Sequence, residues 1–267
     1  MRILTALSFM ACAACLQAQT PVDKSWTILL DAAKDKSFEK RGKAIQAMGV
    51  ITKSARAQAA AEAALADPRE EVRSAAADSL GEMHAKGSAA KLNAALKDPA
   101  TSVVFAAASA LLAIGDPSAY KVYYAVLTGE KKSGDSLVES QLKMLKDPKA
   151  LSKIGFEAGM GFVPFGGVAL TAFKMVTADP VSPVRAAASM RLALDPDPKS
   201  GEALAAATKD KKWLVRAAVV DAIAKRNDPS LLPAITPLLA DENDVVRFNA
   251  AAAVILLSST GSGKATD

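Results

Sequence analysis

Residues 67–83 read DPREEVRSAAADSLGEM, and this stretch decides the fold because the chain repeats its pattern at a fixed distance. An Asp, often followed by Pro, leads after three residues to a Val-Arg pair, then to an alanine-rich run and a large apolar residue. Similar stretches begin at Asp98, Asp179, Asp210 and Asp241, and the spacing from 67 to 98, 179 to 210 and 210 to 241 is always 31 residues. A fixed period of this length predicts an array of stacked units.

Two degenerate copies extend the series. The stretch that begins at Asp35 aligns with the one at Asp67, and the stretch at Asp147 aligns with the one at Asp179, each with an offset of 32 residues. The pattern therefore predicts about seven units, and only the interval from 98 to 147 is irregular, at 49 residues. We interpret the excess as an insertion at about residues 129–146, followed by an atypical unit at 147–178.

Each unit is predicted to be a pair of helices. The starting Asp is expected to cap the first helix, with Pro at the first helical position. Val72, Ala76, Ala77 and Leu80 then share one face at helical spacing. A turn and a shorter second helix follow, such as residues 90–96 or 231–239. Aromatic residues are only 5% of the chain and strand-like alternation is nearly absent, so the expected fold class is all-α. Such hairpins must stack, because one alone cannot bury its apolar faces.

The pattern resembles the short HEAT-like repeats of bacterial proteins, the type also seen in the phycobilin lyase group. The resemblance covers about residues 23–258 and implies a right-handed α-solenoid. It also implies that the repeated arginine bonds acidic or carbonyl groups of the adjacent unit, as an internal ladder. The matching positions are Arg41, Arg73, Arg185, Arg216 and Arg247, with Lys153 as a weaker copy. Val104 departs from the pattern, so we expect an interruption at the third unit.

The first residues are typical of an export signal. Arg2 precedes an uncharged apolar stretch at residues 3–14, and a small residue, Ala18, follows at the expected cleavage site. The sequence thus predicts a signal peptide at 1–18, the array at 19–258, a flexible tail at 259–267, and a periplasmic or secreted protein. Both cysteines, Cys12 and Cys15, lie within the signal. Their surroundings fit a lipidation motif poorly, but that alternative stays open.

Charge and residue inventory exclude several functions. The net charge of +5 is small and interspersed, which argues against nucleic acid as a partner. The single histidine, His84, is expected at a helix end, where it can interact with the last carbonyls or lie on the surface. Zinc and similar sites need several ligands, and no catalytic set is recognisable. Residues 261–264, GSGK, lack the rest of a phosphate-binding loop. The sequence predicts no enzyme activity, no metal and no cofactor.

The unit at 147–178 departs most from its siblings. It carries three glycines where the others have alanines, and residues 158–173 contain no charge. Aromatic residues gather on both sides of the insertion, and we interpret six of them as candidates for binding a partner: Tyr120, Tyr123, Tyr124, Phe156, Phe162 and Phe165. Three interpretations remain open for this apolar region: packing within the array, binding of a partner, and contact with a membrane.

The sequence therefore favours a non-enzymatic, exported scaffold that binds a protein or peptide in an unassigned pathway. A membrane-surface adaptor, held by residues 158–173 or by a lipidated cysteine, is the alternative. An enzyme subunit of the bilin-lyase type is suggested by the resemblance alone, and the residue inventory does not support it.

Overall fold

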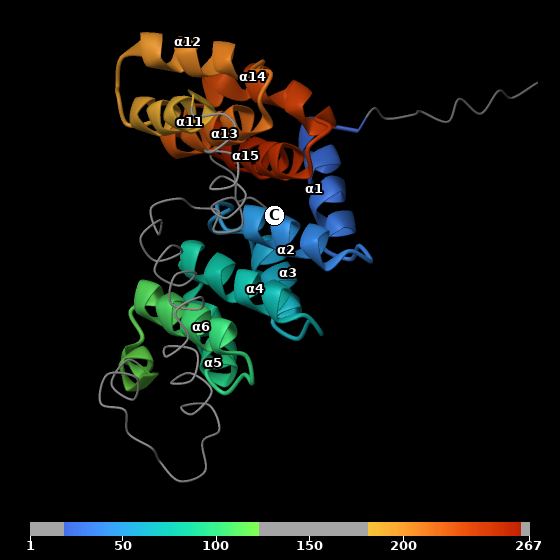
Figure 1. The fold of residues 1–267 in the computed structure, drawn as a ribbon, viewed down its shortest axis with the longest axis vertical. Helices are drawn as coiled ribbons and strands as arrows, with labels where there is room; N and C mark the ends of the chain where they lie inside the picture. The colour runs from blue at the N-terminus through green and yellow to red at the C-terminus, as the bar shows by residue number, and fades with distance from the viewer. Residues whose placement is uncertain (1–18, 123–180, 263–267) are drawn as a thin grey trace, which may run out of the picture.

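The computed structural model describes residues 19–122 and 181–262, and within both ranges the chain forms helices and turns without any strand (Figure 1). The predicted all-α class is confirmed, as is the stack of helical hairpins. The insertion at 129–146 and the atypical unit at 147–178 lie outside the described residues.

The first range contains a single helix followed by three hairpins. Its helices are α1 (Pro21–Ala32), α2 (Phe38–Met48), α3 (Ala55–Ala64), α4 (Glu70–Glu82), α5 (Ala89–Ala95) and α6 (Thr101–Ile114), with short 3-10 turns η1 (Lys86–Ser88) and η2 (Pro117–Ala119). The long helices α2, α4 and α6 are the first helices of their repeats, each preceded by the starting Asp.

The second range contains α11 (Val181–Leu192), α12 (Pro198–Ala207), α13 (Trp213–Arg226), η3 (Pro229–Leu231), α14 (Leu232–Ile235), η4 (Thr236–Ala240) and α15 (Asp244–Ser262). The second helix predicted at 231–239 is broken into η3, α14 and η4. Pro233 and Pro237 explain the break, because each removes a backbone donor from a helical ladder. The last helix, α15, continues to Ser262, beyond the predicted end of the array at 258.

The apolar face predicted for the first helix is buried. In α4, Val72 is 1% exposed, and Ala76, Ala77 and Leu80 are fully buried. Small side chains on this face allow close approach between neighbouring helices. At Gly81, an added methyl group would stand 2.8 Å from Ala110 Cα on α6, so no side chain fits there without moving a helix. The stack therefore depends on small residues at the contacts between first helices.

The predicted capping of the first helices is wrong in detail. α4 begins at Glu70, so Asp67 and Pro68 precede the helix, and its N-cap residue, Arg69, makes no side-chain capping bond. Asp67 instead accepts a hydrogen bond from the backbone N–H of Arg69, at 2.9 Å, in a local turn. The same turn joins Asp98 to Ala100, at 2.8 Å. The reason is that the carboxylate is engaged by an arginine of the preceding repeat.

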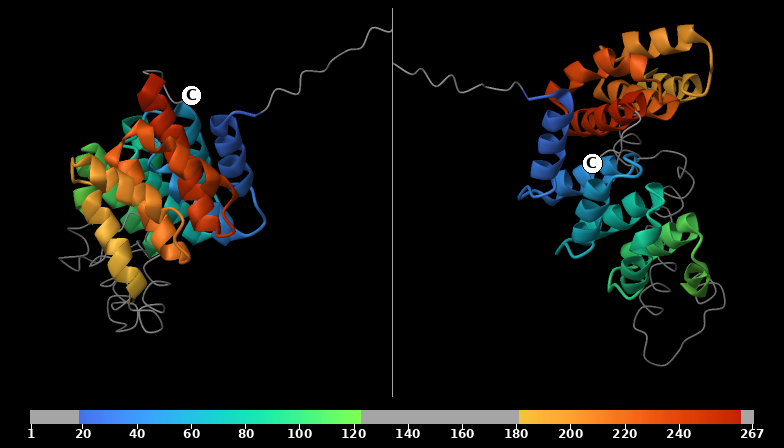
Figure 2. Two further views of the ribbon diagram at one scale, coloured as in Figure 1. Left: turned by 90° about the horizontal axis from the view of Figure 1, so that it is seen from above. Right: turned by 180° about the vertical axis from the view of Figure 1, so that it is seen from behind.

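The order of the repeats in space differs from their order in the chain. Helices α2, α4 and α6 pack side by side, as do α11, α13 and α15. In addition, α15 packs against both α1 and α2, and Figures 1 and 2 show the N-terminal helix alongside the C-terminal one. The first helices therefore form the spatial row α11, α13, α15, α2, α4, α6. A stack in chain order would have kept α15 far from α2.

Among the described helices, none is both long enough and apolar enough to cross a membrane.

Candidate functional site

Of the six aromatic residues predicted to bind a partner, the structure describes Tyr120. Its side chain is 51% exposed and lies at the end of η2, in the third repeat. Leu112, in the last turn of α6 in the same repeat, is 37% exposed. Tyr123, Tyr124, Phe156, Phe162 and Phe165 lie outside the described residues, as does Lys153.

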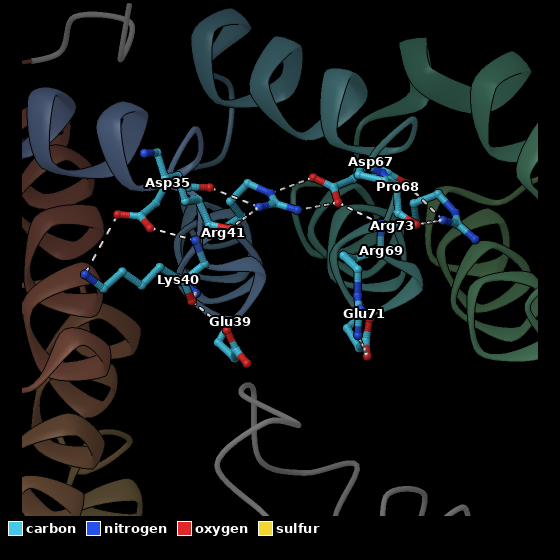
Figure 3. Close-up of polar contacts among 11 residues, drawn as sticks. Asp35, Glu39, Lys40, Arg41, Asp67, Pro68, Arg69, Glu71 and Arg73 are labelled. Carbon is cyan, nitrogen blue, oxygen red and sulfur yellow. Dashed lines mark hydrogen bonds and ion pairs between the residues drawn. The ribbon is translucent and has the colours of Figure 1, made fainter.

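The repeated arginines join neighbouring repeats by two-point ion pairs (Figure 3). Arg41 on α2 donates from Nε to Asp67 Oδ2, at 2.7 Å, and from Nη2 to Asp67 Oδ1, at 2.8 Å. Its third nitrogen, Nη1, donates to the carbonyl of Asp35 in its own repeat, at 3.0 Å. The guanidinium of Arg41 thus connects the turn that precedes α2 to the turn that precedes α4.

The two-point geometry recurs where Arg73 pairs with Asp98 and where Arg216 pairs with Asp241. Arg185, which is half exposed, makes a single bond to Asp210, from Nη2 to Oδ2. Val104 takes the arginine's place in the third repeat and is fully buried. Arg247, on α15, bonds Asp244 of its own helix and the carbonyl of Asp241. The ladder is therefore a set of internal joints, and it ends at α15.

These joints set the electrostatics of the starting aspartates. The hydrogen bond from Arg41 holds the pKa of Asp67 below its usual value. For Asp98, burial alone would raise the pKa, but the hydrogen bonds from Arg73 and from the Ala100 N–H outweigh it and lower the pKa. Each aspartate is consequently ionised at neutral pH and occupied within the fold, which leaves it unsuited to bind an external ligand.

A second polar group, missed in the sequence, consists of charged side chains of α4 and α13 that interact electrostatically. We call Asp78, Glu82, Asp221 and Lys225 the carboxylate cluster. Glu82 interacts electrostatically with Asp78, one turn earlier on α4, and with Lys225 on α13. Asp221 on α13 interacts with Lys225 and Glu82, and it accepts a hydrogen bond from Asn249 of α15, at 3.0 Å. The cluster therefore spans the junction of the two described ranges.

Crowding in this cluster raises the pKa values of two carboxyl groups. Loss of solvent around its carboxyl group, with a further contribution from Asp78, raises the pKa of Glu82 to about 8, although the residue as a whole is exposed. Lys225 acts in the opposite direction. The pKa of Asp221 is also raised, chiefly by burial, against the effects of Lys225 and Asn249. Near neutral pH the cluster can therefore exchange protons, and three carboxyl groups face one ammonium group.

The sequence did contain a signal for this cluster. Asp78 and Asp221 both stand eleven residues after the starting Asp of their repeats, and Glu82 and Lys225 stand fifteen after it. On one helix, positions four residues apart lie on the same face. Comparison of these positions between repeats therefore predicts a polar face on each first helix. Only the three-dimensional structure shows that the polar faces of α4 and α13 lie close enough to interact electrostatically.

His84 is exposed, as one of the two expectations had it, and its side chain does not bond a carbonyl of its own helix. It lies just beyond α4 with a left-handed backbone, φ 52°, and its Nδ1 stands 3.1 Å from the carbonyl oxygen of Ala113, in the last turn of α6. With Nδ1 as the donor, the ring satisfies a carbonyl of the neighbouring repeat. This role is structural, since it joins the ends of two first helices.

The surface carries shallow hollows open to solvent. One, of about 400 Å³, lies between the starts of α4 and α6 and is lined by Pro68, Arg69, Glu70, Glu71, Arg73, Pro99 and Ala100. In the described ranges, no group of three His, Cys, Asp or Glu side chains is arranged to hold a metal ion. Open polar hollows of this kind suit contact with another surface better than enclosure of a small molecule.

Comparison with known proteins agrees with the fold. A family model described as HEAT repeats matches residues 26–111, 58–130 and 171–255. No curated protein matches the chain. Among solved structures, the chain is similar to human deoxyhypusine hydroxylase in complex with glycerol, with 18% identity, a TM-score of 0.30, and coverage of 90% of this chain and 94% of that chain. An engineered protein gives 17% identity, a TM-score of 0.30, and coverage of 89% and 97%. Both likenesses are too distant to carry an argument about function.

Proposed function

Because this chain belongs to the HEAT-repeat family, we propose that it is an exported scaffold that holds a protein partner. Arrays of this kind present an extended surface, and their functions lie in the residues that depart from the repeat. The observation that carries the proposal is the pair of exposed apolar side chains, Leu112 and Tyr120, in the third repeat.

Leu112 and Tyr120 are two of the three large apolar side chains that are exposed in the described ranges. In the two described ranges, the other large apolar side chain counted as exposed is Leu194, which is 75% exposed and follows α11 at the other end of the spatial row. Exposed tyrosines are frequent anchors in protein interfaces, since they combine a large apolar ring with a polar tip. A patch around Tyr120 is thus a chemically suitable place for a protein partner.

The patch also adjoins the part of the sequence that breaks the repeat. Tyr120 is three residues before Tyr123, and the predicted insertion and the atypical unit follow. We propose that the aromatic residues Tyr123, Tyr124, Phe156, Phe162 and Phe165 complete the site. Insertions in repeat arrays commonly map to the binding face, which supports this placement.

Export is supported by the start of α1. The N-cap residue is Thr20, whose Oγ1 accepts a hydrogen bond from the N–H of Asp23, at 3.1 Å, while Asp23 bonds back to the cap. Cleavage after Ala18 would leave this capping box whole. The proposed mature protein, residues 19–267, would therefore begin one residue before an intact helix cap.

A bait experiment tests this function. Residues 19–267 are immobilised, incubated with an envelope extract of the source organism, and the retained proteins are quantified by mass spectrometry. The double variant Leu112→Ser/Tyr120→Ser is expected to lose the partner at least tenfold. Leu194→Ser is the control, since it removes a more exposed leucine, at 75%, from the other end of the row.

Equal recovery by the wild type and the double variant would contradict the proposed position of the site. Recovery of the protein only in a detergent phase, with no protein partner, would favour a membrane-surface adaptor instead.

A further inference from the structure

Helix α1 precedes the first starting Asp, yet its buried positions follow the register of a second helix. In the described ranges, six residues before the starting Asp of a repeat stands a side chain that is at most 1% exposed. These residues are Leu29, Ala61, Leu92, Leu204 and Ile235, on α1, α3, α5, α12 and α14. Ten residues before each Asp stands another buried side chain, namely Ser25, Ala57, Ser88, Ser200 or Leu231. By this register α1 is the second helix of a repeat.

In the part of the chain that the structure describes, no first helix precedes α1 in sequence, and α15 packs against α1 instead. α1 packs against both α15 and α2, and so connects the last first helix of the chain to the earliest one. In the described chain, α15 is also a first helix whose own second helix does not follow it in sequence. The two unmatched halves therefore meet in space.

The burial of α15 supports this pairing. Five consecutive residues of α15, from Ala250 to Val254, are fully buried, which covers the whole circumference of a helix. In α4 and α6, the residues in the register of Ala252 are Asp78 and Ser109, and both are exposed. A helix at the open end of an array would keep one face in solvent. α15 is thus covered even on a face that α4, inside the row, leaves exposed, and it does not lie at an open end of the array.

We propose that α1 and α15 are the two halves of one HEAT repeat divided between distant parts of the chain, and that α1 is a strap whose docking closes the array. This pairing places α15 next to α2 and so joins the two described ranges into one row. It also brings α13 towards α4, which assembles the carboxylate cluster. The inference stands apart from the proposed function, since it concerns how the array is held together.

The joint differs from the others in lacking an arginine pair. In the ladder, each arginine reaches the starting Asp of the next repeat in the row, which for Arg247 would be Asp35. Arg247 instead bonds Asp244 and the Asp241 carbonyl, while Asp35 accepts from the N–H of Ser37 and lies 3.8 Å from Lys40. The joint between α15 and the first repeat therefore rests mainly on apolar packing. It is the place where the closed array can open.

Hydrogen exchange on residues 19–267 tests the strap. Leu29→Ala should lower the protection of the α15 amides by roughly 30-fold, because it empties a buried position on α1. Leu204→Ala is the matched control in the same register of α12, and it should lower protection in α11–α13 while leaving α1 unchanged. If Leu29→Ala unfolds the whole chain, Leu29→Val supplies the same comparison with a smaller cavity.

Loss of protection in α2 and α3, with α15 unchanged, would overturn the proposal and make α1 a cap of the first hairpin. A dimer that exchanges α1 between two copies, detected by sedimentation and removed by Leu29→Ala, would also overturn a strap within one chain.

Discussion

Arg216 holds Asp241 of the following repeat by two hydrogen bonds, from Nε to Oδ2 at 2.7 Å and from Nη2 to Oδ1 at 2.8 Å. Its Nη1 donates to the carbonyl of Asp210, the starting residue of its own repeat, at 2.8 Å. Both side chains are nearly buried, at 10% and 5% exposed. The pair thus fixes the distance between two repeats, and we expect it to stabilise the folded protein rather than to bind a ligand.

Truncating this arginine should destabilise the protein without any ligand present. We expect Arg216→Ala to lower the free energy of unfolding by about 3 kcal/mol, because the carboxylate of Asp241 would be left nearly buried without its partner. Thermal and urea denaturation measure the loss. Arg247→Ala is the control, since Arg247 lies at the end of the ladder and should cost roughly 1 kcal/mol. Equal losses in both variants would contradict the ladder.

Acid should weaken the array through its paired carboxylates. Hydrogen bonds from Lys91, Ser88 and Gln58 lower the pKa of Glu62 to about 2. A group whose pKa is lower in the folded state adds stability above its unfolded pKa and loses it as the pH falls. Stability should therefore decline between about pH 4.5 and pH 2. Glu62→Gln should flatten this part of the curve, whereas Glu202→Gln, on the exposed face of α12, should leave it unchanged.

Raising the pH from about 4.5 to 8 should also weaken the protein, through Glu82. The pKa of Glu82 is raised from 4.5 to about 8, so its contribution is fully present below 4.5, the unfolded value, and is lost by the time the pH passes 8. We expect the free energy of unfolding to fall across this interval, and Glu82→Gln to remove most of the fall. The carboxyl carbon of Glu82, followed by NMR, should titrate near pH 8. A midpoint near 4.5, the ordinary value, would contradict the cluster.

Gly81 should tolerate no side chain. Its added Cβ would lie 2.8 Å from Ala110 Cα and 3.0 Å from Ala110 Cβ, so α4 and α6 would have to separate. We expect Gly81→Ala to cost about 1–3 kcal/mol. Gly42→Ala is the control, because its nearest neighbour, Val72 Cγ2, lies 4.0 Å away. That variant should gain about 0.5–1 kcal/mol from better helix propensity. A similar loss in both variants would exclude close packing as the cause.

Much of the fold could be predicted because the apolar residues that form the core recur at the same positions of successive repeats. The buried face of α4, from Val72 to Leu80, follows from helical spacing alone. The turns before η2 and η3 follow from Gly115 and Asn227, which both end their helices in the left-handed conformation. At these positions the conformation that each residue prefers locally is also the one that the packed structure requires. Contacts with distant residues therefore do not change the outcome predicted from the sequence.

The capping error had a physical cause that a single repeat does not reveal. Asp67 is a good N-cap residue by type, but its carboxylate is bound by Arg41 from the preceding repeat. At such a position, the helix N-terminus of the same repeat and the arginine of the preceding repeat compete for the carboxylate, and here the arginine binds it. The distant partner becomes visible only when both repeats are placed side by side.

The row order and the carboxylate cluster lay beyond sequence reasoning for a related reason. A repeat pattern defines which faces can pack, but every first helix offers much the same face. Nothing in the pattern shows whether α15 packs against α2 or instead exposes that face to solvent. Leu29 was the available sign, since its register matches Leu92 and Leu204, yet it reads as an ordinary amphipathic leucine when α1 is considered alone.

The central claim is that α15 lies beside α2, and a distance between labels tests it most directly. Cysteines are introduced at Glu39 and Glu242, which are exposed near the starts of these helices, in a chain of residues 19–267, which contain no cysteine of their own. Spin labels measured by double electron–electron resonance should report backbones separated by one helix spacing, about 10 Å, plus the label arms. A stack in chain order separates the same helices by six spacings, roughly 50 Å, and a distance in that range would contradict the account.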